Sequence, residues 1–163
     1  NNESPAEGLL RIIRETSEPG QRGTIVAKSM SEEDISNFMK WPYTSICTDG
    51  SMSGHPRGHG AFSRVLGLYV REQKLMPIET TIQKMTSLAA ENAGINKRGL
   101  IVPGYYADLV LFDPDTVIDK ATIENSTALS AGVHYVWVNG KLVYNDQKAV
   151  PNFSGTFVKR GNY

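Results

Sequence analysis

The 163-residue sequence carries 17 basic and 17 acidic side chains, and hydrophobic residues make up 40% of it. These values are typical of a folded domain, or of one domain with a small satellite, and they argue against a long disordered chain. The balanced charge argues against a broad nucleic-acid-binding surface, since phosphate contacts require clustered Lys and Arg. No apolar run approaches the roughly 18 residues of a membrane span. The single cysteine excludes an internal disulfide and a CxxC metal site.

The first part of the chain alternates predicted helices and strands. The pattern Ser4-Pro5-Ala6-Glu7 predicts a helix start, because Ser4 can cap, proline suits the first turn, and Glu7 completes a capping box. We then expect a buried strand over 24–27, a helix that opens at Ser31 and closes at Pro42, and a second strand over 44–48. This alternation with short connections is typical of a parallel α/β sheet or barrel.

The middle of the chain is predicted to be a loop followed by two helices. The loop is rich in glycine and runs from Asp49 to Gly60. An amphipathic helix is expected over 62–74. A second helix opens at Pro77, with Gly94 as its C-terminal stop and with Ile78, Ile82, Met85 and Ala89 on one face.

After Gly99 the periodicity changes from helical to alternating, which predicts strands. One strand is expected over 107–112, and two more over 133–138 and 141–144. The pair Asn139-Gly140 between the last two favours a two-residue type I′ hairpin, because both central residues need positive φ. The fold class is therefore α/β, with residues 1–98 α/β and residues 99–150 mostly β. A polar tail spans 151–163.

Asp49 and Arg57 are the first candidates for chemistry. Asp49 directly follows a predicted strand, where a barrel enzyme places catalytic groups, and a carboxylate there can move protons. Arg57 can bind a substrate carboxylate through two hydrogen bonds. The residues alone favour plainer interpretations, an Asp-Gly turn and a solvated loop arginine.

The histidines and the cysteine give weaker signals. His55 and His59 have the spacing of a helical zinc pair, but Pro56 and Gly58 between them oppose a helix. Cys47 is most simply a small core residue of the strand. The aromatic residues of the predicted hairpin are interpreted as sheet packing, because few basic residues lie among them.

Several segments together resemble the amidohydrolase superfamily, and within it the N-acyl-D-amino-acid deacylase (D-aminoacylase) family. The stretch TDG at 48–50, followed by HPRGHGAFSRVLG at 55–67, is similar to a run of the deacylase branch. KMT at 84–86 and LAA at 88–90 are similar to the helix after that run. RGLIVPGYYADLVLFDP at 98–114, continued by VNG at 138–140, is similar to a pattern shared across the superfamily.

The resemblance implies the C-terminal part of a (β/α)8 TIM-type barrel, followed by strands of a small β-sandwich. Residues 24–27 and 44–48 would be the last two barrel strands. Asp49 would be the catalytic carboxylate beside a zinc ion, either near the metal or as a weak ligand to it. Arg57 would hold the α-carboxylate of an N-acyl-D-amino acid substrate, and His55 is a minor further candidate for substrate binding. With the resemblance counted, the functional interpretation of Asp49 and Arg57 becomes the favoured one.

The family's remaining zinc ligands, a His-x-His pair, a cysteine and later single histidines, lie on earlier strands and have no counterpart here. Cys47 does not match the metal cysteine. We therefore expect a fragment of a longer zinc enzyme that hydrolyses N-acyl-D-amino acids, inactive and without bound zinc as this chain alone. Its N-terminus, Asn1-Asn2-Glu3-Ser4, with no starting Met, fits that expectation.

Three alternatives stay open at this point. The parent could be a cyclic amidase, similar to dihydroorotase or hydantoinase, although the context of Arg57 argues against it. The chain could also be a non-catalytic amidohydrolase-like interaction module, or a separate polypeptide could supply the missing strands. Expected partners are the substrate and the missing barrel segment, with homo-oligomerisation open and with no nucleic acid or membrane. The lone cysteine is compatible with the cytoplasm, and a periplasmic parent stays open.

Overall fold

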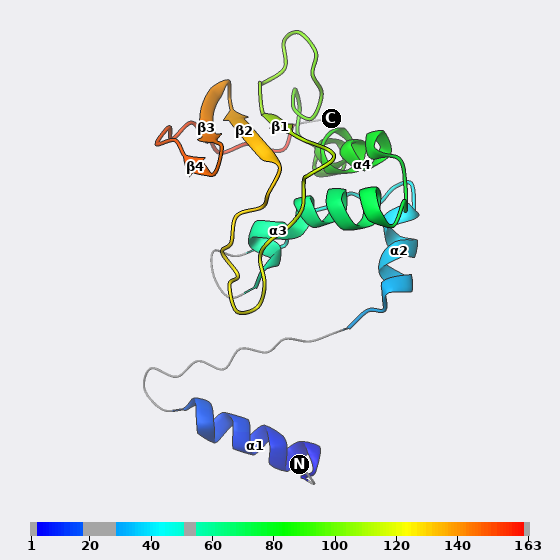
Figure 1. Ribbon diagram of the computed structural model, residues 1–163, viewed down its shortest axis with the longest axis vertical. Coiled ribbons are helices and arrows are strands. Elements are labelled where there is room, and N and C mark those ends of the chain that lie inside the picture. The colour runs from blue at the N-terminus through cyan, green and yellow to red at the C-terminus, as the bar shows by residue number, and fades with distance from the viewer. Residues whose placement is uncertain (1–2, 18–28, 51–54, 162–163) are drawn as a thin grey trace. The chain divides into compact units, whose positions relative to one another are not determined.

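The computed structural model describes residues 3–17, 29–50 and 55–161, and it divides the chain into two compact units, 1–31 and 32–163 (Figure 1). The first unit holds helix α1, Pro5–Thr16. The described residues of the second unit form five helices and then a four-stranded sheet along the chain. Among the described residues, no helix combines the length and the apolar character that crossing a membrane requires.

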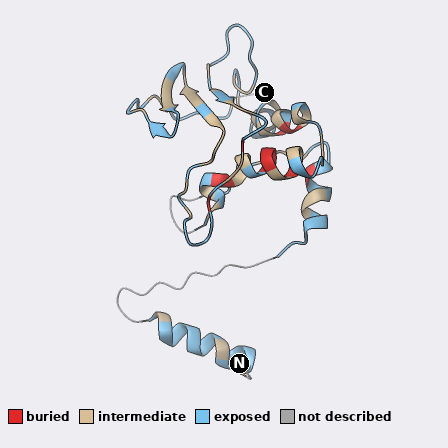
Figure 2. Cartoon of the chain, in the orientation of Figure 1, coloured by how far each residue is buried: buried red, intermediate tan, exposed pale blue. Residues whose placement is uncertain are grey.

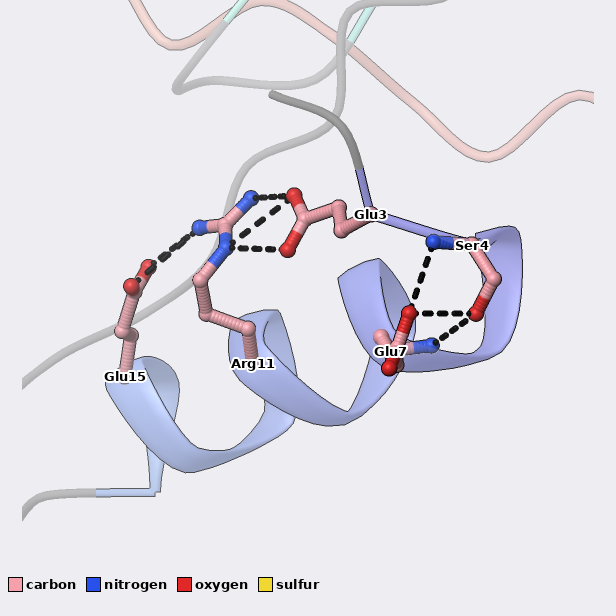
Figure 3. Close-up of polar contacts among 5 residues, drawn as sticks. All are labelled: Glu3, Ser4, Glu7, Arg11 and Glu15. Atoms are coloured by element: carbon pink, nitrogen blue, oxygen red, sulfur yellow. Dashed lines mark hydrogen bonds and ion pairs between the residues drawn. The ribbon is translucent and has the colours of Figure 1, made fainter.

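Helix α1 begins with the predicted capping box, which is confirmed. The Ser4 hydroxyl accepts from the Glu7 backbone N–H, and the Glu7 carboxylate accepts from the Ser4 backbone N–H at 2.8 Å (Figure 3). The Ser4 backbone hydrogen bond is the main reason why the pKa of Glu7 is lowered. Farther along, the Arg11 guanidinium pairs with both Glu3 and Glu15. No residue of α1 is buried, so these contacts fix the helix locally.

The helices of the second unit pack around a small apolar core. They are α2, α3, the π-helix η1, α4 and α5, with the bounds Glu32–Lys40, Arg57–Arg64, Val65–Glu72, Ile78–Met85 and Ser87–Ala93. Met39, Val65 and Tyr69 form the buried cluster. Figure 2 shows most of the buried residues of this unit on its helices, and Val117 and Ala121 are buried in the segment after β1. The Tyr69 hydroxyl donates to the Glu32 carboxylate at 3.0 Å, and burial raises the pKa of Tyr69.

The segment after β1 packs against α3 and η1. Val117 is only 1% exposed, and its carbonyl accepts from Arg71 at 2.6 Å. A Cβ on Gly67 would lie 2.6 Å from the Val117 carbonyl oxygen, so the backbones meet where only glycine fits. Arg64 adds an ion pair to Asp119 at 3.3 Å. These contacts hold the C-terminal end of α3 and helix η1 to a distant part of the sequence.

The sheet is an antiparallel meander of β1, β2, β3 and β4, with the bounds Leu109–Phe112, Val133–Val138, Lys141–Asn145 and Lys148–Ala149. Asn139 and Gly140 have φ of 50° and 78°, which confirms the predicted type I′ hairpin. Arg98 donates to Asn139 Oδ1 at 2.7 Å, pairs with Asp108, and lies 4.3 Å over the Tyr106 ring. Arg98, which follows α5, therefore links the hairpin at Asn139 to the segment that contains Asp108.

Four predicted elements need comment. The strand expected over 24–27 lies outside the described residues. Residues 44–48 are described, but they form no strand. The helix expected from 62 begins earlier, at Arg57, because Pro56 stands at its N-cap, where proline costs no helical hydrogen bond. The helix expected from 77 to 94 is two helices, separated at Thr86, whose hydroxyl donates to the Ile82 carbonyl.

Candidate functional site

The segment that leads to Asp49 is held by α4. The Lys84 ammonium donates to the carbonyl of Trp41 and, at 3.1 Å, to the carbonyl of Thr44. The Lys84 carbonyl accepts from the Ile46 backbone N–H at 3.1 Å. Within the predicted strand over 44–48, these bonds occupy the Thr44 carbonyl and the Ile46 N–H, and the structure assigns no strand to this segment.

Asp49 stands where this segment turns. Its φ is 42°, in the left-handed region that Asp tolerates better than most residues. The next residue, Gly50, lies so close to Gly58 that an added Cβ would be 2.5 Å from the Gly58 Cα. The chain thus leaves the segment, turns at Asp49, and returns beside the first turn of α3.

This turn places Asp49 beside Arg57, the first residue of α3. Arg57 Nη2 lies 3.2 Å from Asp49 Oδ2, and the two side chains are 48% and 78% exposed. An ion pair so open to water contributes little stability, typically below about 1 kcal/mol. Both groups are therefore accessible to a ligand, and the guanidinium keeps further N–H donors beyond the one that faces Asp49.

The two histidines of this stretch have different places. His55 precedes α3, and its Nδ1 accepts from the Arg57 backbone N–H at 3.1 Å, so the ring satisfies one of the helix's free donors. His59 lies within α3, contrary to the expectation that Pro56 and Gly58 prevent a helix here. The His59 carbonyl accepts from the Ser130 hydroxyl at 3.1 Å. The structure brings His55, Arg57 and Asp49 together.

The described residues contain no group of candidate metal ligands large enough for a metal site. Within residues 3–17, 29–50 and 55–161, no three His, Cys, Asp or Glu side chains are grouped so that they could hold an ion. Cys47 is a free, exposed thiol rather than the buried core residue we expected. A catalytic zinc site needs about three protein ligands. The described residues therefore do not fit a complete zinc site.

Sequence reasoning missed Lys84. The residue is 3% exposed, and burial lowers the pKa of its amine. The expected buried face of this helix contained Ile78, Ile82 and Met85, whereas the structure buries Thr81 and Lys84 most deeply. The only available signal was the KMT stretch, which carried a resemblance but no role.

Comparison with known proteins places this chain in a family. Residues 41–144 match the Amidohydrolase family. An N-acyl-D-aspartate deacylase of Alcaligenes xylosoxydans xylosoxydans is 41% identical over 136 residues, which are 82% of this chain and 27% of that protein. A dihydroorotase of Lactobacillus acidophilus is 29% identical over 120 residues, 63% of this chain and 28% of that protein. The chain thus spans little more than a quarter of these relatives.

Solved structures of deacylases are also similar to this chain. A crystal structure of D-aminoacylase is similar with a TM-score of 0.77 and 45% identity, over 80% of this chain and 28% of that one. An N-acyl-D-glutamate deacylase from Bordetella bronchiseptica, complexed with zinc and a phosphonate inhibitor, is similar with a TM-score of 0.68 and 42% identity, over 71% of this chain and 25% of that one.

Proposed function

The chain belongs to the amidohydrolase family, and from this premise we propose that it is the C-terminal part of a zinc-dependent hydrolase of N-acyl-D-amino acids. The match over 82% of this chain but only 27% of an N-acyl-D-aspartate deacylase supports a fragment of a longer enzyme. In this proposal, residues 1–98 are the last strands and helices of a TIM-type barrel. Residues 99–150 are strands of the β-sandwich, and residues 151–163 are a tail.

The observation that carries the proposal is the Asp49–Arg57 pair, with 3.2 Å between Oδ2 and Nη2. Arg57 binds the substrate's α-carboxylate with the guanidinium donors that Asp49 leaves free. Asp49 takes a proton from the attacking water and delivers it to the amide nitrogen as the C–N bond breaks. The products are a carboxylic acid and a D-amino acid. His55 fixes the start of α3 and so the place of Arg57.

The metal belongs, in this proposal, to the part of the enzyme outside this chain. The D-glutamate deacylase structure is complexed with zinc, which supports zinc as the cofactor. Because the described residues group no three candidate ligands, Asp49 contributes at most one ligand or stands beside the ion. The isolated chain is therefore inactive. We place the enzyme in the cytoplasm, with which the single cysteine of this chain is compatible, and its oligomeric state is open to a homo-oligomer.

The experiment compares the complete product of the gene that encodes this sequence with the isolated 163-residue chain. Intact mass defines the gene product, and both proteins are assayed with added zinc. We expect the gene product to release amino acid from N-acyl-D-amino acids and not from the L enantiomers, and the isolated chain to release none. An Asp49→Asn variant of the gene product should lose activity by at least about 100-fold.

Other results would contradict the proposal in distinguishable ways. Faster hydrolysis of dihydroorotate or hydantoins than of N-acyl-D-amino acids would identify a cyclic amidase. A gene product of 17.9 kDa without hydrolase activity would indicate a non-catalytic module. Full activity of Asp49→Asn would remove Asp49 from the chemistry while leaving the substrate class intact.

A further inference from the structure

We propose that Lys84 is the positioning residue for Asp49: its buried ammonium holds the backbone of residues 41–46 and so sets where the Asp49 carboxylate stands. This inference rests on the proposed function. It concerns a residue on another helix, and Lys84 makes no contact with substrate in the proposal.

The burial of Lys84 demands an explanation. Lysine is almost never fully buried unless its charge is compensated, because transfer of an ammonium from water is costly. Here the residue is 3% exposed, and its Nζ donates to the carbonyls of Trp41 and Thr44. A leucine or methionine would fill this space without the desolvation cost. What lysine adds is the ability to hold two carbonyls at once.

The hydrogen bonds described for Lys84 outside its own helix fall on one segment. In addition to the two carbonyls, the Ile46 N–H donates to the backbone carbonyl of Lys84 itself at 3.1 Å. Asn92, one helix farther on, donates to the Tyr43 carbonyl at 3.3 Å. Helices α4 and α5 thus bind four backbone groups of residues 41–46, and Lys84 accounts for three of them.

Asp49 follows this anchored segment after only Cys47 and Thr48. On its other side, Gly50 packs against Gly58, and the carboxylate reaches Arg57. The backbone on the two sides of Asp49 is therefore held by two supports, one from α4 and one from α3. A proton-transfer group must lie within hydrogen-bonding reach of its substrate atom, so a shift of about 1 Å in the first support lowers the rate strongly.

The test uses Lys84→Met in the complete gene product, with Lys120→Met as the matched control on an exposed lysine. The first measurement is hydrogen exchange of peptides that cover 41–50 and 133–145. We expect exchange over 41–50 to rise by about tenfold in Lys84→Met, because two carbonyls lose their donor, and exchange of the hairpin to stay unchanged. Lys120→Met should change neither.

The second measurement is the ratio of two hydrolysis rates, an N-acyl-D-amino acid against the matched α-acyloxy acid, in which oxygen replaces the amide nitrogen. An alcohol leaves more easily than an amine, so the ester depends less on the proton from Asp49. We expect Lys84→Met to lower the amide rate about tenfold more than the ester rate. This ratio does not depend on the folded fraction. Lys84→Gln, which keeps a shorter neutral donor, is used if Lys84→Met does not fold, and should shift the ratio less.

Three results overturn the inference alone: unchanged exchange over 41–50, a general rise in exchange that includes the hairpin, or equal loss of amide and ester hydrolysis. Any of them would make Lys84 an ordinary structural residue. A wild-type gene product that hydrolyses neither substrate would instead overturn the proposed function, whatever the exchange of 41–50 shows.

Discussion

Arg57 faces two ways, toward Asp49 and toward solvent. Its Nη2 lies 3.2 Å from the Asp49 carboxylate, and about half of the side chain is exposed. A guanidinium offers five N–H donors in a planar fork, so one pair with Asp49 leaves a second edge for another carboxylate. Lysine has the same charge but cannot present two parallel donors to a carboxylate. Replacing Arg57 by lysine should therefore weaken substrate binding.

We predict that Arg57→Lys in the complete gene product raises KM for N-acyl-D-amino acids by about tenfold and changes kcat much less, because it weakens ground-state binding of the carboxylate. Steady-state kinetics measure both constants. Arg14→Lys, in the last turn of α1, is the control and should behave as wild type. A fall in kcat at constant KM would show that Arg57 acts on the reaction step instead.

At the scale of single residues, the sequence indicated Asp49 and Arg57 and missed Lys84. Asp49-Gly50 and the HPR stretch are local patterns, so they can be recognised without a structure. The role of Lys84 depends on the carbonyls of Trp41 and Thr44, more than 35 residues away in the sequence. A lysine at helical spacing is ordinarily interpreted as solvent-facing, and only the packing of α4 against residues 41–46 reverses that.

Elements set by local chemistry were predictable, and elements set by distant partners were not. The α1 capping box and the Asn139-Gly140 hairpin depend on residues that are close in sequence, and both are confirmed. The strand expected over 44–48 needs a neighbouring strand, and here its backbone bonds to α4 instead. The π-helical turn of η1 has no sequence signature that we recognised.

The contact between η1 and the segment after β1 leads to a prediction at this scale. Gly67→Ala would place a Cβ 2.4 Å from Ile118 Cδ1 and 2.6 Å from the Val117 carbonyl oxygen. Alanine usually stabilises a helix by about 1 kcal/mol over glycine, but a backbone clash cannot relax easily, and overpacking costs about 1–3 kcal/mol. We expect a net destabilisation, measured as a lower midpoint of urea unfolding.

Gly155→Ala is the matched control, because a Cβ there meets nothing within 4 Å. Its urea midpoint should be close to that of wild type. A Gly67→Ala variant as stable as Gly155→Ala would mean that η1 and residues 117–118 separate readily, and that their contact does not hold α3 in place.

The whole molecule exposes many large apolar side chains. In the second unit they include Trp41 and Tyr43, which meet edge to face with ring centres 5.8 Å apart, and Ile101, which is 88% exposed. Strand β1 is an edge of the sheet, and its Val110 and Leu111 are both exposed. Exposed apolar groups and open strand edges promote association.

We predict that the isolated 163-residue chain binds a hydrophobic dye such as ANS and self-associates at micromolar concentration, whereas the complete gene product does neither to the same extent. Dye fluorescence and sedimentation velocity measure the two properties. An isolated chain that stays monomeric and dye-free would show that these surfaces need no covering, and would favour the independent module over the fragment.

The close approach of Gly50 to Gly58 also bears on how new substrate preferences can arise. Asp49 and Arg57 act, in the proposed function, on the amide and the carboxylate that all N-acyl amino acids share. Because no side chain fits on Gly50, a substitution there pushes the segment of Asp49 away from the helix that carries Arg57. The positions of Asp49 and Arg57 are therefore constrained by one close backbone contact, and we expect adaptation to another acyl group or amino acid to use other parts of the enzyme.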